Sequence, residues 1–146
     1  MNAPAAYFAD TSFWIALSHK PDQHHAQAAA WSGHLIREHA CLVTTEAVLW
    51  EWMNALAAIG TRRTTAEGYR RCHQDPNIDV VPFSPETIAA TVRFYEARSD
   101  KGWSLTDCLS FLTMEQRGIA RALTSDHHFQ QAGFEALLLG NPPAAA

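Results

Sequence analysis

The chain has 146 residues, 47% of them hydrophobic and 18% charged, and its formal net charge is −4 at pH 7. This length and hydrophobic content indicate one folded domain with a single core and argue against a disordered chain. The acidic balance argues against a general nucleic-acid coat protein, because such proteins carry a basic excess that follows the phosphates, so any contact with nucleic acid must be local.

The three cysteines stand far apart, at positions 41, 72 and 108, and no C-x-x-C pair occurs. Neither a disulfide framework nor a cysteine zinc site is therefore indicated. The N-terminus lacks the basic start and apolar run of a signal peptide, and no apolar stretch approaches the length of a membrane span. We expect a cytoplasmic protein with a single domain over residues 1–140 and a disordered tail over 141–146.

Apolar runs and helix-start signals alternate along the first part of the chain. The run over residues 5–9 predicts a first strand that ends at Asp10, and residues 11–17 predict a helix. Asp22 is the candidate cap of a second helix that continues to about His39.

A second strand is predicted over residues 41–45, where β-branched side chains are frequent, and Glu46 follows it at once. A helix is predicted over 46–59, because its apolar residues recur at helical spacing. The apolar face comprises Val48, Leu49, Trp52, Met53, Leu56 and Ile59. Trp50 lies off this face.

The next predicted helix, over residues 61–73, is polar and contains four arginines, at positions 62, 63, 70 and 71. Arg63 and Arg70 are seven residues apart and share a helix face. We consider them candidates to bind nucleic-acid phosphates, with a solvated surface as the alternative.

A third strand is predicted over residues 78–83, with Pro82 near its end. Ser84 and Pro85 then have the order of an N-cap and a first helical position. The inner face of this helix is predicted to comprise Ile88, Val92 and Tyr95.

The last third of the chain begins with a capping box, in which Ser104 caps a helix and Asp107 returns a hydrogen bond. That helix is predicted to end near Gly118. A fourth strand over 119–123, a short helix over 127–131 and an edge strand over 134–139 complete the prediction. Alternating strands and helices indicate an α/β fold, a doubly wound and mainly parallel sheet of four or five strands flanked by helices.

Four acids occupy comparable places in this pattern, namely Asp10, Glu46, Asp107 and Asp126. Three of them follow strands, and Asp107 begins the helix that leads into the fourth strand. Each has a structural explanation as a helix cap or a favourable first-turn charge. Because the carboxyl ends of parallel strands share one edge, however, the four are expected to converge there.

Converging carboxylates oppose ionisation and folding unless a cation neutralises them. Oxygen ligands, without histidine or cysteine at matching strand ends, favour Mg²⁺ or Mn²⁺ over zinc. Such a cation with bound water suits phosphodiester hydrolysis, because it polarises the phosphate and orients or helps deprotonate the attacking water.

Four segments of the chain carry a family resemblance, namely residues 9–12, 45–46 with 52–56, 103–108 and 123–129. Through these segments, nearly the whole chain resembles the PIN-domain ribonucleases, in particular the VapC toxins of bacterial and archaeal toxin–antitoxin pairs. The resemblance implies a doubly wound sheet, an acidic quartet that binds Mg²⁺ or Mn²⁺, endonucleolytic cleavage of RNA and inhibition by a cognate antitoxin.

Carried over to this chain, the resemblance makes Asp10 and Asp107 the principal metal ligands. It gives Glu46 a role in supporting the metal or its water, and Asp126 completes the catalytic quartet. Two further positions match hydroxyl groups near such a site, namely Ser12 and Thr124.

Two non-enzymatic alternatives stay open, an inactive RNA-binding module and a phosphoacceptor signalling domain. The latter needs an acid pair after the first strand, an aspartate closing the third and a lysine after the fifth. Here Asp10 stands alone and Phe83 closes the third strand, while the two lysines lie at positions 20 and 101. The glycine motifs G-x-x-x-x-G-K-S/T and G-x-G-x-x-G are absent, which argues against nucleotide-binding folds of those types.

Histidines and tryptophans offer further candidates. His127 and His128 adjoin Asp126, but a zinc site would need a third ligand at suitable spacing, so a packed turn is favoured. Trp50 is a candidate contact for the antitoxin, a second subunit or an RNA base, with packing on a neighbouring helix as the alternative. The many large aromatics, Trp14, Trp31, Trp50 and Trp52, suggest a homodimer and a complex with the antitoxin.

Overall fold

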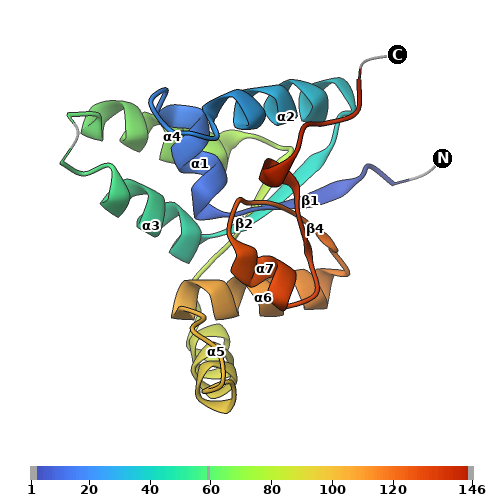
Figure 1. The fold of residues 1–146 in the computed structure, drawn as a ribbon. Coiled ribbons are helices and arrows are strands. Elements are labelled where there is room, and N and C mark those ends of the chain that lie inside the picture. The colour runs from blue at the N-terminus through green and yellow to red at the C-terminus, as the bar shows by residue number, and fades with distance from the viewer. Residues whose placement is uncertain (1–2, 59, 145–146) are drawn as a thin grey trace.

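Five parallel strands form one sheet in the computed structural model, which describes residues 3–58 and 60–144. The strand order is β3-β2-β1-β4-β5 (Figure 1). The strands are β1 (Ala6–Ala9), β2 (Cys41–Thr45), β3 (Ile78–Val81), β4 (Arg121–Leu123) and β5 (Glu135–Ala136). The central strand β1 pairs with β2 on one side and with β4 on the other. The chain therefore winds outward in both directions, which confirms the predicted doubly wound sheet.

Helices cover both faces of this sheet. Figure 1 draws α1, α2 and α4 above it and α5 and α6 below it. The helices are α1 (Thr11–Ser18), α2 (His25–Arg37), α3 (Glu46–Ala55), α4 (Arg62–Gln74), α5 (Pro85–Ala97), α6 (Leu105–Arg117) and α7 (His127–Gln131). Among the described residues, no helix is both long and apolar enough to cross a bilayer.

The core is built from the strands and the helix faces turned toward them. On the predicted apolar face of α3, Val48, Leu49 and Trp52 are buried, and Leu56 just beyond the helix is buried as well. Met53 is partly buried against the same core, and Ile59 lies outside the described residues. This face is therefore confirmed over its described length.

Several helices and strands are shorter in the structure than the sequence predicted. Helix α2 begins at His25, because the Asp22 carboxylate accepts a hydrogen bond from the backbone N–H of His24 at 2.8 Å and closes a turn before the helix. The helix ends before His39, whose φ of 51° is left-handed.

Most predicted strands are shorter in the structure, and β4, predicted from residue 119, begins at Arg121. Strand β3 ends at Val81, directly before Pro82, which has no N–H to donate to a sheet. The predicted edge strand over 134–139 reduces to β5, and the 3₁₀ turn η1 (Leu137–Leu139) follows it. In the tail, residues 141–144 carry no helix or strand, and residues 145–146 lie outside the described residues.

The predicted inner face of α5 was wrong. Ile88, Val92 and Tyr95 are 46–50% exposed, whereas Thr91 is buried. Helix α5 packs against α6, and Phe94 stacks on Trp103 with ring centroids 6.1 Å apart. The stripe therefore points away from the core and leaves an apolar surface uncovered.

Candidate active site

Asp10 lies at the switch in strand order, directly after β1 and beside the end of β4. Its backbone N–H donates to the carbonyl of Leu123 at 3.2 Å, so the residue extends the pairing of the two strands. It occupies the N-cap position of α1, but its side chain makes no capping bond to that helix. The carboxyl group is instead buried, with only 4% of the residue exposed.

Two hydroxyl groups hold the Asp10 carboxyl group. Thr124 Oγ1 donates to Asp10 Oδ2 at 2.8 Å, and Ser12 Oγ donates to the same oxygen at 3.3 Å. The hydroxyls lie 3.0 Å apart, and each also accepts a backbone N–H, from Ser125 to Ser12 and from Asp126 to Thr124. These bonds tie the loop after β4 to the loop after β1 and place the hydroxyls of Ser12 and Thr124 beside the Asp10 carboxylate.

The environment raises the pKa of Asp10 from its usual value of 3.8 to about 7. Burial is the main cause, because a charged carboxylate loses its hydration there. The hydrogen bond from Thr124 and the nearby backbone of Thr11 lower the pKa, while the charges of Asp107 and Glu51 raise it. Asp10 is thus a buried acid that lies within the electrostatic reach of two others.

Asp107 forms the predicted capping box of α6 and lies close enough to Asp10 to act on its ionisation. Its N–H donates to Ser104 Oγ at 3.0 Å, and its Oδ2 accepts the N–H of Ser104 at 3.2 Å, which is the capping box of α6. The same Oδ2 lies 3.2 Å from His128 Nδ1. Asp107 is 8% exposed, and its charge acts on Asp10.

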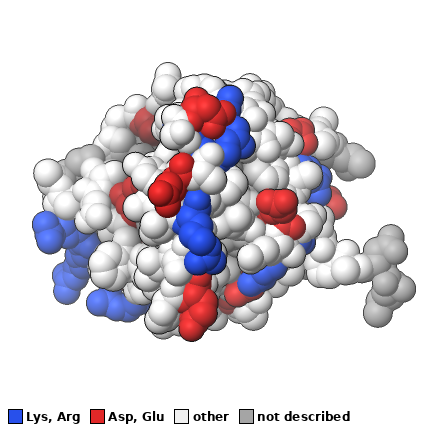
Figure 2. All heavy atoms as spheres, turned by 90° about the horizontal axis from the view of Figure 1, so that it is seen from below, with Lys and Arg blue, Asp and Glu red and all other residues white. Residues whose placement is uncertain are grey.

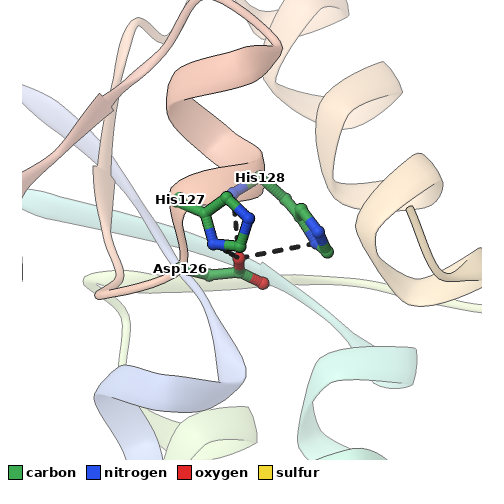
Figure 3. A group of neighbouring side chains, drawn as sticks. All are labelled: Asp126, His127 and His128. Atoms are coloured by element: carbon green, nitrogen blue, oxygen red, sulfur yellow. Dashed lines mark hydrogen bonds and ion pairs between the residues drawn. The ribbon is translucent and has the colours of Figure 1, made fainter. Parts of the chain in front are cut away.

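Asp126 caps the short helix α7 through the N–H of His128, which donates to Oδ1 at 2.9 Å. The same oxygen lies 3.5 Å from His128 Nδ1 and 3.7 Å from His127 Nδ1. Figure 3 shows the two imidazole rings next to each other and beside this carboxylate. The predicted packed turn is present, since Phe129 is fully buried, but both histidines stay beside the acid.

Glu46 begins α3 and contacts α4. Tyr69 Oη donates to both carboxylate oxygens at 3.2 and 3.1 Å, and His73 Nε2 lies 2.6 Å from Oε1. Partial burial and these contacts raise the pKa of Tyr69. The Glu46 carboxylate therefore joins two helices.

Glu51 is the acid of α3 that acts on Asp10, and sequence reasoning missed it. Residues advance by about 100° around a helix, so Glu46 and Glu51 point in directions that differ by about 140°. Of the two, Glu51 is the one whose charge raises the pKa of Asp10. One sequence feature could have identified Glu51: it lies off the apolar face of a helix that starts beside Asp10.

An apolar groove with a volume of about 420 Å³ adjoins Glu51. Trp50 forms part of its wall and is 58% exposed, with its ring 5.8 Å from that of Phe83 in an edge-on arrangement. The groove continues along the uncovered surface of α5 at Ile88 and Val92. Trp50 thus packs on a neighbouring side chain and still presents a face to solvent.

The four arginines of α4 are exposed, including the candidate pair Arg63 and Arg70. Figure 2 shows a group of basic side chains at its left, on the side where Figure 1 draws α3 and α4. Elsewhere that face mixes acidic and basic groups. The exposed arginines of α4 are therefore a local group of positive charges on a protein whose net charge is −4.

The family model of the PIN domain matches residues 7–135 of this chain. The 23S rRNA-specific endonuclease VapC20 of Mycobacterium tuberculosis is 29% identical over 129 residues, which are 87% of this chain and 94% of that protein. The crystal structure of VapC20, described as a Sarcin-Ricin loop cleaving toxin, aligns with a TM-score of 0.75 at 25% identity and covers 88% of this chain and 95% of its own.

Two further solved structures share the fold at lower identity. VapBC2 from Rickettsia felis, bound to a DNA fragment from their promoter, aligns with a TM-score of 0.63 at 11% identity and covers 90% of this chain and 96% of its own. FitAcB from Neisseria gonorrhoeae aligns with a TM-score of 0.57 at 19% identity and covers 89% of this chain and 94% of its own. With the family model matched over most of its length, this chain belongs to the PIN-domain family.

Proposed function

We propose that this protein is a divalent-metal-dependent endoribonuclease and the toxin of a toxin–antitoxin pair. The observation that carries the proposal is the buried Asp10 at the strand switch, with the charges of Asp107 and Glu51 directed at it. The likeness to VapC20, named as a 23S rRNA-specific endonuclease, supports RNA as the substrate class. The three free cysteines are consistent with a reducing cytoplasm.

The side chains at this site suit Mg²⁺ or Mn²⁺. Burial and neighbouring negative charge both oppose ionisation of Asp10, and a divalent cation relieves both. Carboxylate oxygens are the ligands that these cations prefer. We propose Asp10 and Asp107 as the principal ligands, with Asp126 completing the acidic set. When bound, such a cation would polarise the RNA phosphate and activate a water molecule.

The surrounding residues position these acids. The hydroxyls of Ser12 and Thr124 hold one oxygen of Asp10 in place, and the capping box does the same for Asp107. We assign to Glu51 the role expected of Glu46, supporting the cation or its water, because Glu51 acts on Asp10.

Glu46 receives a different role in this proposal. Its carboxylate binds Tyr69 and His73, and so holds α4 against the start of α3. Helix α4 carries Arg63 and Arg70, which we propose contact RNA phosphates beside the site. Glu46 would thus fix the orientation of the RNA-binding helix.

The partners proposed are a second copy of the chain and a protein antitoxin. Three of the four tryptophans cited above, Trp14, Trp31 and Trp52, are buried in the core and offer no contact surface. The uncovered surface of α5 and Trp50 supports association instead, because exposed apolar patches mark interaction sites. The resemblance to VapC toxins supports the antitoxin.

The first prediction concerns Asp10 without metal. Its pKa is about 7 in the folded protein and near 3.9 in an unfolded chain, so the folded state holds the proton more tightly between these values. The unfolding free energy therefore falls as pH rises from about 4 to about 7, by at most roughly 4 kcal/mol from this group. Asp10→Asn should raise the Tm of the metal-free protein at pH 8 and much less at pH 5.

Thermal melts at the two pH values, with and without Mg²⁺, test this prediction. Mg²⁺ should stabilise the wild-type protein at pH 8 and have little effect on Asp10→Asn. An equal Tm difference between the two proteins at both pH values would contradict the assignment.

The second prediction separates the two glutamates. Glu51→Gln should lower metal-dependent RNA cleavage by about 10- to 100-fold, because it removes a charge that acts on the metal site. Glu46→Gln keeps the hydrogen-bonding shape toward Tyr69 and should have a smaller effect. Asp107→Asn should remove cleavage with the fold retained.

Cleavage of total RNA at saturating Mg²⁺, with circular dichroism as the folding control, gives these rates. Full activity of Asp107→Asn would overturn the site, and a larger loss in Glu46→Gln than in Glu51→Gln would reverse the assignment of the glutamates. A wild-type protein without metal-dependent cleavage would favour the inactive binding module.

The third prediction concerns Arg63 and Arg70. Each arginine that contacts a phosphate releases counterions, so log affinity should fall with log salt by about 0.7 per contact on single strands. Replacing both by glutamine should weaken RNA binding and make this slope shallower by about 1.4. RNA affinity is measured across a salt series in the Asp107→Asn background, which leaves the RNA uncut. An unchanged slope would mean that the pair is only solvated.

The fourth prediction concerns association. Ile88→Glu with Val92→Glu places charges on the uncovered surface of α5 and should convert a dimer to a monomer. Ile36→Glu is the matched control, since Ile36 is an exposed apolar residue of α2. Light scattering measures the mass, and a monomeric wild-type protein at tens of micromolar would contradict the homodimer. Failure to form a stable complex when co-expressed with the product of the neighbouring reading frame would contradict the antitoxin.

A further inference from the structure

Two imidazoles stand beside the acidic site without a role in the chemistry proposed above. Asp126, His127 and His128 each offer a ligand atom, and these atoms all lie within 4.8 Å of one another (Figure 3). His128 Nδ1 also lies 3.2 Å from Asp107 Oδ2. The structure thus brings together two nitrogen and two oxygen donors from α6 and α7.

These separations match those of a small metal site. Nitrogen and oxygen ligands bind Zn²⁺ at about 2.0–2.2 Å, so two ligands of a tetrahedral ion lie about 3.3–3.6 Å apart. The separations from His128 Nδ1 are 3.2 Å to Asp107 Oδ2 and 3.5 Å to Asp126 Oδ1, and that from His127 Nδ1 to Asp126 Oδ1 is 3.7 Å.

The donor chemistry favours a different cation from the carboxylate site. Imidazole suits zinc and the later transition metals, whereas Mg²⁺ prefers oxygen ligands. The sequence alone argued against zinc because it showed no third ligand at suitable spacing. The structure supplies a third in Asp126, and it places Asp107 Oδ2 3.2 Å from His128 Nδ1 as a neighbouring oxygen donor.

The site is also accessible. The His127 side chain is 70% exposed, and that of His128 is 25% exposed and lies between the two acids. An ion can therefore reach His127 from solvent and complete its coordination with the more buried groups. Because His127 is so exposed, its replacement should leave folding unchanged.

We propose that Asp126, His127 and His128, with Asp107, form a binding site for a transition-metal cation, Zn²⁺ being the first candidate. Zn²⁺ bound there occupies Asp107 and Asp126, which the proposed nuclease site needs for Mg²⁺. Zinc should therefore inhibit cleavage, a consequence that rests on the proposed function. Binding itself is measured without RNA, so it fails or succeeds independently of that function.

Calorimetric titration with Zn²⁺ at neutral pH tests the site in the full chain. The wild-type protein should bind one equivalent, and His127→Asn and His128→Asn should each weaken this binding at least tenfold. His39→Asn is the matched control, because His39 is exposed and remote, and its left-handed φ accommodates asparagine. The affinity of His127→Asn for Mg²⁺ should equal that of the wild-type protein.

Visible absorption of the Co²⁺-loaded protein gives a second readout. Tetrahedral coordination with imidazole gives intense visible bands, and these should weaken in His127→Asn and His128→Asn but not in His39→Asn. Circular dichroism confirms the fold of each variant. Unchanged Zn²⁺ affinity and unchanged Co²⁺ bands in His127→Asn would overturn the proposal.

Discussion

The burial of one carboxyl group, that of Asp10, is the constraint on which the site depends. A carboxylate in that position loses its hydration, and the nearby charges of Asp107 and Glu51 add to the difficulty of ionising it. The fold offsets part of this with hydroxyl donors from Ser12 and Thr124. What remains is a buried acid whose pKa stays well above its usual value.

Much of this arrangement follows from local sequence signals. Strands followed by acids predicted the sheet and the placement of Asp10 and Asp126, because parallel strands all end at one edge. The capping box of Asp107 was also predictable, because its partner Ser104 is only three residues away in the chain. Signals of this kind depend on the backbone path, which a short stretch of sequence determines well.

Features that depend on side-chain direction were harder to predict. Glu46 and Glu51 lie on one helix, and only its packing angle decides which faces Asp10. The stripe at Ile88 and Val92 has regular helical spacing, yet α5 turns it toward solvent and packs on α6. Periodicity identifies an apolar face but does not identify the partner that covers it. The stripe that the sequence analysis assigned to the core is therefore part of the surface.

The bond from Thr124 to Asp10 joins residues 114 positions apart in the chain. A growing chain that ends before β4 lacks Thr124 and Asp126, and so it lacks the hydroxyl that holds Asp10 and one acid of the set. Domains made of such long-range contacts acquire their structure late in synthesis. The site therefore assembles only after β4 and the residues that follow it have been synthesised.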